Sequence, residues 1–274
     1  DNGYDISDYC AINPEFGTLA DFDRLAAEAH RRGIRIIFDM VCNHSSDQHP
    51  WFIEARMSKE SAKRDFYIWR DGRGEAEPNN WQADFGGSAW TFDPTTDQYY
   101  LGVFSPYQPD LNWENPEVRN RIYETMCWWT RHGVDGFRLD VINFLSKAPG
   151  LPDAPIPEKA SAGQKYVPGG VFYVDQPGIH PLLQEMRQQV FAPTGTIAIG
   201  ECHGRKLTPE PETGGRYIRE ERGELDMMFH FDIPWFFRNN MVALGFRRIG
   251  EWCAAAGTGG WTTLTFNNHD MPRQ

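Results

Sequence analysis

The chain has 274 residues, of which 40% are hydrophobic and 14% aromatic, so it can bury a large core and is not expected to be disordered. Its formal net charge of −11 argues against nucleic acid or an anionic membrane as a partner, because both require a basic surface. No apolar run reaches the ~18 residues that a membrane-spanning helix needs. An uncharged ligand is fully compatible with this composition.

The cysteines and the ends of the chain add two expectations. Five scattered cysteines without a CxxC pair predict neither a disulfide framework nor a zinc site, so we expect a reducing, cytoplasmic setting and no metal or cofactor. The chain opens at Asp1 without a methionine and closes at Gln274 directly after "NNHDMP", which leads us to expect a piece of a longer protein.

The first predicted elements are a helix, a strand and an irregular insertion. Residues 18–33 place apolar side chains on one helix face, with Thr18 as N-cap and Gly33 at the end. The β-branched run 34–41 follows at once and predicts a buried strand. Residues 45–112 lack sustained periodicity and are rich in Trp, Asp, Gly and Pro, which indicates an insertion rather than a repeating unit.

The second half of the chain again alternates helices and strands. Residues 115–133 predict a helix that begins after Asn115, has Pro116 at its first position and ends at Gly133. The further predicted elements are, in order, a strand at 134–141, a Pro- and Gly-rich loop at 146–180, a helix at 180–191, and strands at 196–201, 224–231 and 261–268.

Four of the five predicted strands end in polar or ionisable residues on their carboxyl side. A (β/α)₈ barrel gathers the carboxyl ends of all its parallel strands into one mouth. A doubly wound sheet collects such residues only near its switch point. We therefore predict an α/β fold of the TIM-barrel type, in which these five strands are three short of closure.

The stretch "GFRLDVINF" (136–144) carries two full charges inside an apolar run. Arg138 and Asp140 share one face of the predicted strand because alternate residues point to the same side. A neighbouring guanidinium lowers the pKa of a carboxyl group, so Asp140 is a candidate nucleophile near neutral pH. A purely structural ion pair explains the spacing equally well.

Two further carboxyl groups lie at strand ends. Glu201 ends an apolar strand, where apolar neighbours raise the pKa of a carboxyl group and favour a general acid, although it can also simply reach solvent. Asp270 follows the last predicted strand beside His269, and its alternative role is that of a helix N-cap. An ionised and a protonated carboxyl group across a sugar-sized gap are the groups that glycosidic bond cleavage needs.

Aromatic residues are concentrated in and beside the insertion. Their faces, together with Asp, Asn and Gln, suit stacking on sugar rings and hydrogen bonding to hydroxyls, although we expect most of them to pack the insertion's own core. The nine residues are Trp51, Trp69, Trp81, Trp90, Tyr99, Tyr100, Phe104, Tyr107 and Trp113.

Five short motifs occur in order: "DMVCNH" (39–44), "QPDLN" (108–112), "GFRLDVIN" (136–143), "GE" (200–201) and "NNHD" (267–270). In these motifs the chain resembles the α-amylase family of glycoside hydrolases, in its oligo-1,6-glucosidase/α-glucosidase branch, over residues 1–274.

The resemblance implies a (β/α)₈ TIM barrel with an inserted B domain. Residues 1–44 and 113–274 then belong to the barrel, roughly strands 3 to 7, and residues 45–112 form the B domain. The remaining strands, the C-terminal domain and the amino-terminal calcium-type loop of many relatives are absent from this chain. We therefore expect the isolated chain to be inactive, because a partial barrel exposes sheet edges and inner apolar surface.

The resemblance also implies the site residues of a retaining glucosidase that trims neutral oligosaccharides as a monomer. Asp140 matches the nucleophile, Glu201 the general acid/base and Asp270 a transition-state stabiliser. The matches to substrate-binding positions are Arg138, which orients the nucleophile; His44 and His269, which bind sugar hydroxyls; Asp1 and Tyr4, which hold the terminal glucose; and Phe104 and Asp110, which line the same pocket.

Linkage preference depends on Val141, since Val after the nucleophile is typical of α-1,6-acting members and Ala or Thr of α-1,4-acting ones. Trehalose-6-phosphate hydrolases share this Val, but a phosphate substrate calls for clustered cations, and Lys147, Lys159 and Lys165 form no compact cluster in the sequence.

The resemblance is also compatible with an α-1,4-glucosidase, a sucrose isomerase or a non-catalytic interaction subunit. One departure from the family pattern is the "ECHG" (201–204) that begins at the predicted general acid.

Overall fold

The computed structural model describes residues 3–158, 163–203, 210–257 and 259–265. They form two compact units. Unit 1 comprises Asp1–Phe22, Val41–Trp128 and Phe144–Gln176, and unit 2 comprises Asp23–Met40, Trp129–Asn143 and Pro177–Gln274. Within the described residues, no helix is both long and apolar enough to cross a membrane.

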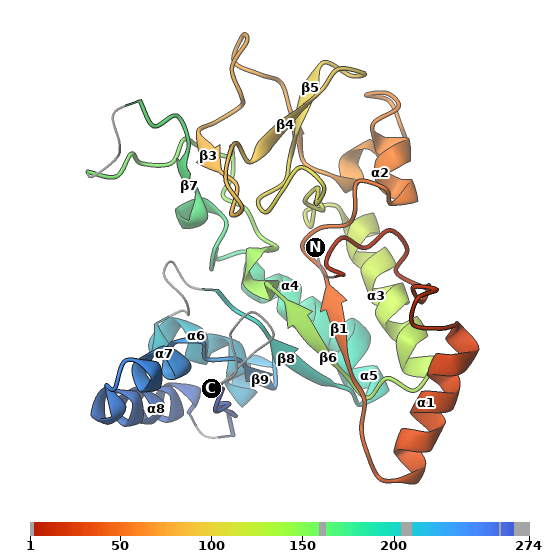
Figure 1. Ribbon diagram of the computed structural model, residues 1–274, viewed down its shortest axis with the longest axis vertical. Coiled ribbons are helices and arrows are strands. Elements are labelled where there is room, and N and C mark those ends of the chain that lie inside the picture. Colours follow the sequence, from red (N-terminus) through yellow and green to blue (C-terminus); the bar gives the residue numbers. More distant parts are fainter. Residues whose placement is uncertain (1–2, 159–162, 204–209, 258, 266–274) are drawn as a thin grey trace. The chain divides into compact units, whose positions relative to one another are not determined.

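Unit 2 is built on a four-stranded sheet with the order β1-β6-β8-β9 (Figure 1). β6 pairs in parallel with β8, and β8 pairs in parallel with β9, so the chain has the α/β architecture with a parallel sheet that the sequence predicts. The strands are β1 (Ile37–Val41), β6 (Gly136–Asp140), β8 (Ile197–Gly200) and β9 (Met227–Met228).

The helix that leads into β1 begins as predicted. α1 (Leu19–Arg31) starts after Thr18, whose backbone N–H donates to Asp21 Oδ2 at 2.8 Å while its hydroxyl accepts from the Asp21 N–H at 3.3 Å. The predicted strand at 34–41 forms as β1, but the prediction that it is buried is confirmed only in part. Only the last two residues of β1 are buried and Ile37 is 42% exposed, because β1 is the edge strand of its sheet.

The predicted helix between the first two strands is also confirmed. α3 (Pro116–Arg131) begins after Asn115, whose side chain accepts from the Glu117 N–H at 2.9 Å. It ends before Gly133, which has a φ of +95° and lies so close to Ala26 that a Cβ would be 2.9 Å from that side chain. Phe137 of β6 packs against Phe191, and both rings are buried.

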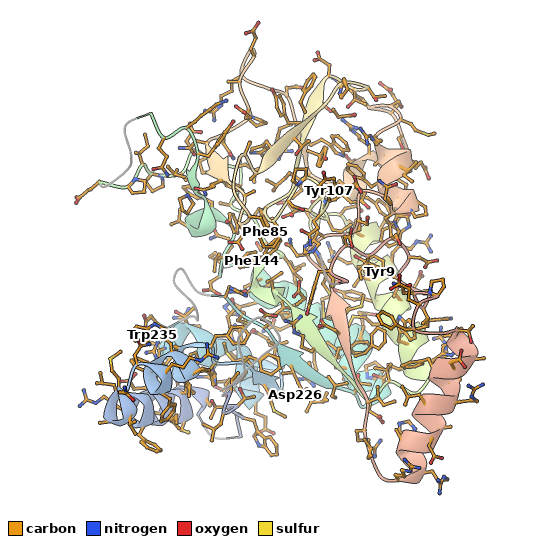
Figure 2. All side chains as sticks on the ribbon, in the orientation of Figure 1. Tyr9, Phe85, Tyr107, Phe144, Asp226 and Trp235 are labelled. Carbon is orange, nitrogen blue, oxygen red and sulfur yellow. The ribbon has the colours of Figure 1, made fainter. Side chains whose placement is uncertain are left out.

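The other helical segments follow the later strands, and most of them were not predicted. They are α4 (Ile179–Met186), the π-helical turn Arg187–Phe191, α5 (Ala192–Thr194), α6 (Pro211–Ile218), α7 (Asp232–Arg238), α8 (Val242–Ala256) and the 3₁₀ turns Ile142–Phe144, Gly170–Phe172 and Glu220–Arg222. Trp235 of α7 is 46% exposed (Figure 2).

The last predicted strand is not formed where the structure describes it. Residues 261–265 have no regular secondary structure, and residues 266–268 lie outside the described residues. Thr263 bonds through its side chain instead, since its hydroxyl donates to the Met228 carbonyl at 2.6 Å. Thr263 therefore contacts β9 through its side chain, and residues 261–265 are not assigned to a strand.

Unit 1 contains residues 45–112, the predicted insertion, which have more regular secondary structure than their sequence indicates. Its three-stranded antiparallel sheet has the order β2-β5-β4, and a separate pair joins β3 in parallel with β7. The elements are α2 (Pro50–Ala55), the 3₁₀ turn Arg64–Phe66, β2 (Trp69–Arg70), β3 (Trp81–Gln82), β4 (Trp90–Asp93), β5 (Gln98–Leu101) and β7 (Val167–Pro168).

The core of unit 1 is aromatic. Phe52 is fully buried and has the rings of Tyr67, Trp69 and Tyr100 around it at centroid distances of 4.9–5.7 Å. Five of the nine aromatic residues singled out in the sequence are buried: Trp69, Trp81, Trp90, Tyr100 and Trp113. Trp81 stacks on Phe172 and Trp113 lies against Tyr123, both outside 45–112, so the prediction that most of the nine pack the insertion's own core stays a prediction.

Candidate active site

Arg138 contacts three carboxylates where β6 and β8 of unit 2 end. Its Nη1 donates to Asp140 Oδ1 at 2.8 Å and to the two oxygens of Asp39 at 2.9 and 3.1 Å, while Nη2 contacts Glu201 Oε2. The register of the two strands explains this grouping. Leu139 lies opposite Gly200, so the next residue of each strand, Asp140 and Glu201, reaches the same edge of the sheet.

Three members of this cluster are largely shielded from water, whereas the Asp39 side chain is 45% exposed. The side chains of Arg138, Asp140 and Glu201 are 12, 10 and 5% exposed. A nearly buried carboxylate needs a charged partner, and one guanidinium serves all three acids. The cluster therefore holds the predicted nucleophile and the predicted general acid on a single cation.

The surroundings of Glu201 differ from those expected from the sequence. Apolar neighbours were expected, but Arg138 contacts Oε2 and the His203 ring Nε2 lies 2.8 Å from Oε1. The main chain of Glu201 is fixed on the same edge, because its N–H donates to the Leu139 carbonyl at 2.9 Å and its carbonyl accepts from the Ile142 N–H at 3.0 Å.

Val141, directly after Asp140, has an unusual backbone conformation. Its φ is +36°, in the left-handed region that a β-branched residue rarely adopts, and its side chain is 4% exposed. Such conformations cost of order 1–3 kcal/mol and are found preferentially at functional sites. Val141 lies between the end of β6 at Asp140 and the 3₁₀ turn that begins at Ile142.

Four of the predicted sugar-binding residues lie together in unit 1. His44 Nε2 is 3.0 Å from the Tyr4 carbonyl, and its ring centroid is 5.2 Å from that of Phe104. Asp110 pairs with His44 through an isolated antiparallel bridge. Phe85 and Phe144, both labelled in Figure 2, each have their ring within 6.2 Å of Phe104.

Asp110 is fully buried and its carboxylate is bound from two directions. Lys147 Nζ lies 2.8 Å from Oδ2, and the Val103 N–H donates to Oδ1 at 3.1 Å. Lys147 also donates to Asn43 Oδ1 at 2.8 Å and to the Phe144 carbonyl at 2.7 Å. Burial lowers the pKa of Lys147, and the Asp110 carboxylate opposes that shift.

Asp1, His269 and Asp270 lie outside the described residues. Two residues that contact the candidate site were not assigned there from the sequence. Lys147 was considered only as a phosphate ligand. His203 carried a signal in the "ECHG" departure, but the contact with Glu201 was not foreseen. Within the described part of the chain, no group of three or more His, Cys, Asp or Glu side chains is placed to hold a metal ion.

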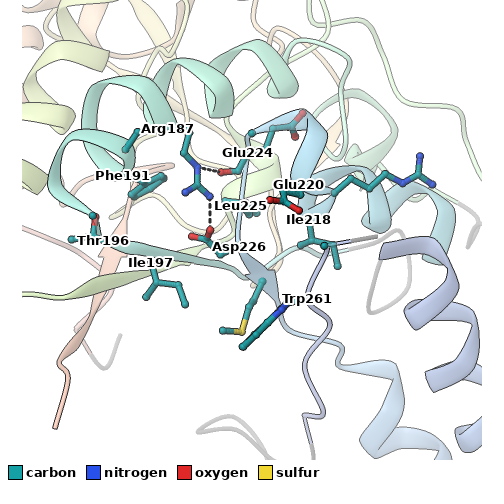
Figure 3. Close-up of a pocket in the computed structure, with 16 residues that line it drawn as sticks. Arg187, Phe191, Thr196, Ile197, Ile218, Glu220, Glu224, Leu225, Asp226 and Trp261 are labelled. Atoms are coloured by element: carbon teal, nitrogen blue, oxygen red, sulfur yellow. Dashed lines mark hydrogen bonds and ion pairs between the residues drawn. The ribbon is translucent and has the colours of Figure 1, made fainter. Parts of the chain in front are cut away.

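A cavity of about 670 Å³ lies at the other end of the unit 2 strands (Figure 3). Ile197 and Met227, which begin β8 and β9, line it, so it does not include the carboxyl ends where Asp140 and Glu201 lie. The guanidinium of Arg187, which also lines the cavity, donates to Asp226 at 2.8 Å and to the Glu224 carbonyl at 3.0 Å. This cation is therefore already engaged by the protein rather than offered to a ligand.

Comparison with known proteins shows what this chain is similar to. The family model for the α-amylase catalytic domain matches residues 1–274. Over its whole length the chain is 48% identical to an oligo-1,6-glucosidase of Halalkalibacterium halodurans, covering 49% of that protein, and 45% identical to a trehalose-6-phosphate hydrolase of Escherichia coli, covering 48%. The chain thus spans about half the length of the curated relatives it matches.

Solved structures of enzymes with related names are also similar to this chain. A trehalose-6-phosphate hydrolase of Bacillus licheniformis superposes with a TM-score of 0.88 at 43% identity, over 100% of this chain and 49% of that one. The trehalulose synthase of Pseudomonas mesoacidophila MX-45 superposes with a TM-score of 0.84 at 40% identity, over 98% of this chain and 48% of that one.

Proposed function

Because the chain belongs to the α-amylase family of glycoside hydrolases, we propose that the full-length protein is a retaining, exo-acting α-glucosidase specific for α-1,6 bonds. The substrates are isomaltose and short isomalto-oligosaccharides, cleaved from the non-reducing end. One observation carries the proposal: the Arg138 guanidinium, on a side chain that is 12% exposed, contacts both Asp140 and Glu201, so both carboxyl groups lie together at one edge of the sheet.

In the proposed mechanism, Asp140 attacks the anomeric carbon of the terminal glucose while Glu201 protonates the departing glycosidic oxygen. Water that Glu201 deprotonates then hydrolyses the glucosyl ester, which regenerates both carboxyl groups and retains the anomeric configuration. Arg138 keeps Asp140 ionised and oriented for the attack. Asp270 is proposed as the third carboxylate, which stabilises the transition state.

The other predicted site residues are proposed to bind the sugar. His44 and His269 bind hydroxyls of the glucose at the cleavage point, and Asp1 and Tyr4 hold its far side. Phe104 supplies an apolar face for the ring, with Asp110 behind it in the same pocket. Arg138 and Val141 complete the set, and Val141 favours the α-1,6 linkage.

Two of the three lysines considered as phosphate ligands support a neutral sugar over a phosphorylated one, while Lys159 lies outside the described residues. Lys147 is 5% exposed and gives its three N–H groups to Asp110, Asn43 and the Phe144 carbonyl, so none is left for a phosphate. Lys165 is paired with Glu77 at 2.9 Å. These lysine contacts support an α-1,6-glucosidase over a trehalose-6-phosphate hydrolase. The latter is the name of relatives whose identity to this chain is nearly as high.

A substrate panel tests the linkage claim. The full-length protein is assayed with isomaltose, maltose, sucrose and trehalose 6-phosphate, and we expect the highest kcat/KM on isomaltose. Product analysis at high sugar concentration separates hydrolysis from transglycosylation and from sucrose isomerisation. A clear preference for any other member of the panel would refute the α-1,6 assignment.

A single substitution tests the nucleophile. Asp140→Asn is expected to lower kcat by at least about 10⁴-fold, because it removes covalent catalysis while leaving the side chain nearly isosteric. The variant should still bind isomaltose in a calorimetric titration. Substantial remaining turnover would show that another residue is the nucleophile, and sugar binding without turnover in the unmodified protein would favour a non-catalytic relative.

A further inference from the structure

His203 lies two residues after Glu201, and its ring is directed at the Glu201 carboxyl group. Nε2 is 2.8 Å from Oε1, and the His203 side chain is 39% exposed, so the imidazole can exchange protons with water. Phe231 meets the ring edge to face at a centroid distance of 5.9 Å. The contact therefore joins an accessible titratable ring to a carboxyl group that is only 5% exposed.

The backbone of His203 is held in place by the 3₁₀ turn that follows β6. Asn143, which is fully buried, donates from Nδ2 to the His203 carbonyl at 2.5 Å and accepts from the His203 N–H at 3.1 Å. Asn143 comes three residues after Asp140. These two hydrogen bonds hold the main chain of His203 against the turn after β6.

The charges around the Glu201 carboxyl group decide where its proton can reside. Arg138 faces Oε2 and can only donate, which makes Oε2 an acceptor. Asp140 and Asp39 also bind Arg138 and add negative charge nearby. His203 Nε2 lies 2.8 Å from the other oxygen, Oε1, so a proton between these two atoms can be held by either group.

We infer that His203 is a positioning residue for the general acid/base, fixing the Glu201 carboxyl group through Oε1 and sharing its proton. This inference rests on the proposed function of Glu201. Two interacting groups that share one proton titrate as a pair, so the pH range of the acid step belongs to both residues. Glu201 itself remains the group that meets the glycosidic oxygen.

The test compares two leaving groups in the full-length protein. The leaving group of isomaltose is the second glucose, whose oxygen must be protonated as it departs, whereas the leaving group of 2,4-dinitrophenyl α-glucoside is a stable phenolate that needs almost no protonation. For His203→Gln we expect kcat/KM to fall about 10-fold or more on isomaltose and less than about 3-fold on the aryl glucoside. His203→Asn is a second variant that should show the same split.

The pH profile gives an independent readout. Because the shared proton can be held by either group, it leaves the pair at a higher pH than it would leave Glu201 alone, so the alkaline limb of kcat/KM on isomaltose should move to lower pH in both His203 variants, by about 0.5 unit or more. His132→Gln is the matched control, since His132 follows α3 and pairs with Asp23 at 2.6 Å. It should change neither the leaving-group split nor the pH profile.

The outcomes separate the inference from the proposed function. An equal fall on both substrates with an unmoved pH profile would mean that His203 is merely structural, and no fall on either would mean that it has no part in the reaction. Either result overturns the inference and leaves the glucosidase proposal intact. An unmodified protein that cleaves neither substrate would overturn both.

Discussion

The buried pair of Lys147 and Asp110 offers the sharpest test of how unit 1 is held together. Lys147→Met removes the ammonium group that binds the Asp110 carboxylate, whose side chain is 0% exposed. Removing one partner of a buried ion pair costs about 3–5 kcal/mol, because the other charge stays buried without compensation. For a cooperative unit as long as this chain, this corresponds to a fall in Tm of about 5–9 °C, and for one twice as long to about half of that.

Thermal unfolding of the full-length protein measures this loss. Lys147→Met/Asp110→Asn should recover more than half of it, since the double variant leaves no charge of this pair buried. Lys59→Met is the control, because Lys59 lies 3.9 Å from Asp71, both side chains are exposed, and such pairs contribute less than about 1 kcal/mol. If Lys147→Met stays as stable as the control, or if it selectively loses activity on trehalose 6-phosphate, then Lys147 does not serve as the structural counter-charge of Asp110.

Two further predictions concern linkage and acid stability. Val141→Ala should lower the ratio of kcat/KM on isomaltose to that on maltose by about 10-fold or more, and an unchanged ratio would remove Val141 from linkage selection. Burial, aided by Arg248, lowers the pKa of His230 to about 3, so its contribution to stability is present above pH 6.5 and is lost below it, by about 2 kcal/mol between pH 7.5 and 5. His230→Gln should therefore shrink the Tm difference between these two pH values, and an unaltered difference would show that His230 titrates normally.

The elements that could be predicted from the sequence are those whose signals are local. Thr18 and Asn115 begin α1 and α3 because a side-chain oxygen accepts from an N–H in the first turn, and this needs no distant contact. Gly133 ends α3 for an equally local reason, a φ of +95°. The grouping of Arg138 with Asp140 follows from the two-residue period of a strand.

The features that were missed depend on contacts across the sequence. Ile37 reads as a core residue, yet its exposure is decided by the position of β1 at the edge of the sheet. The approach of His203 to Glu201 depends on Asn143, 60 residues earlier in the chain. Lys147 likewise looks like a surface cation until its partner Asp110, 37 residues away, is known. A pattern of residue types does not encode such pairings.

The distribution of charge in the two units suits the proposed reaction. In unit 2, three carboxylates share the one guanidinium of Arg138, so the cluster carries an excess of negative charge when all four groups are ionised. That excess costs stability in a nearly buried site, but it favours a transition state with oxocarbenium character, which develops positive charge on the sugar. In unit 1, Lys147 cancels the charge of Asp110, so the predicted sugar-binding group has no net charge from this pair. A neutral sugar then gains its binding from hydroxyl and ring contacts, while the electrostatic contribution is kept for the step in which charge appears.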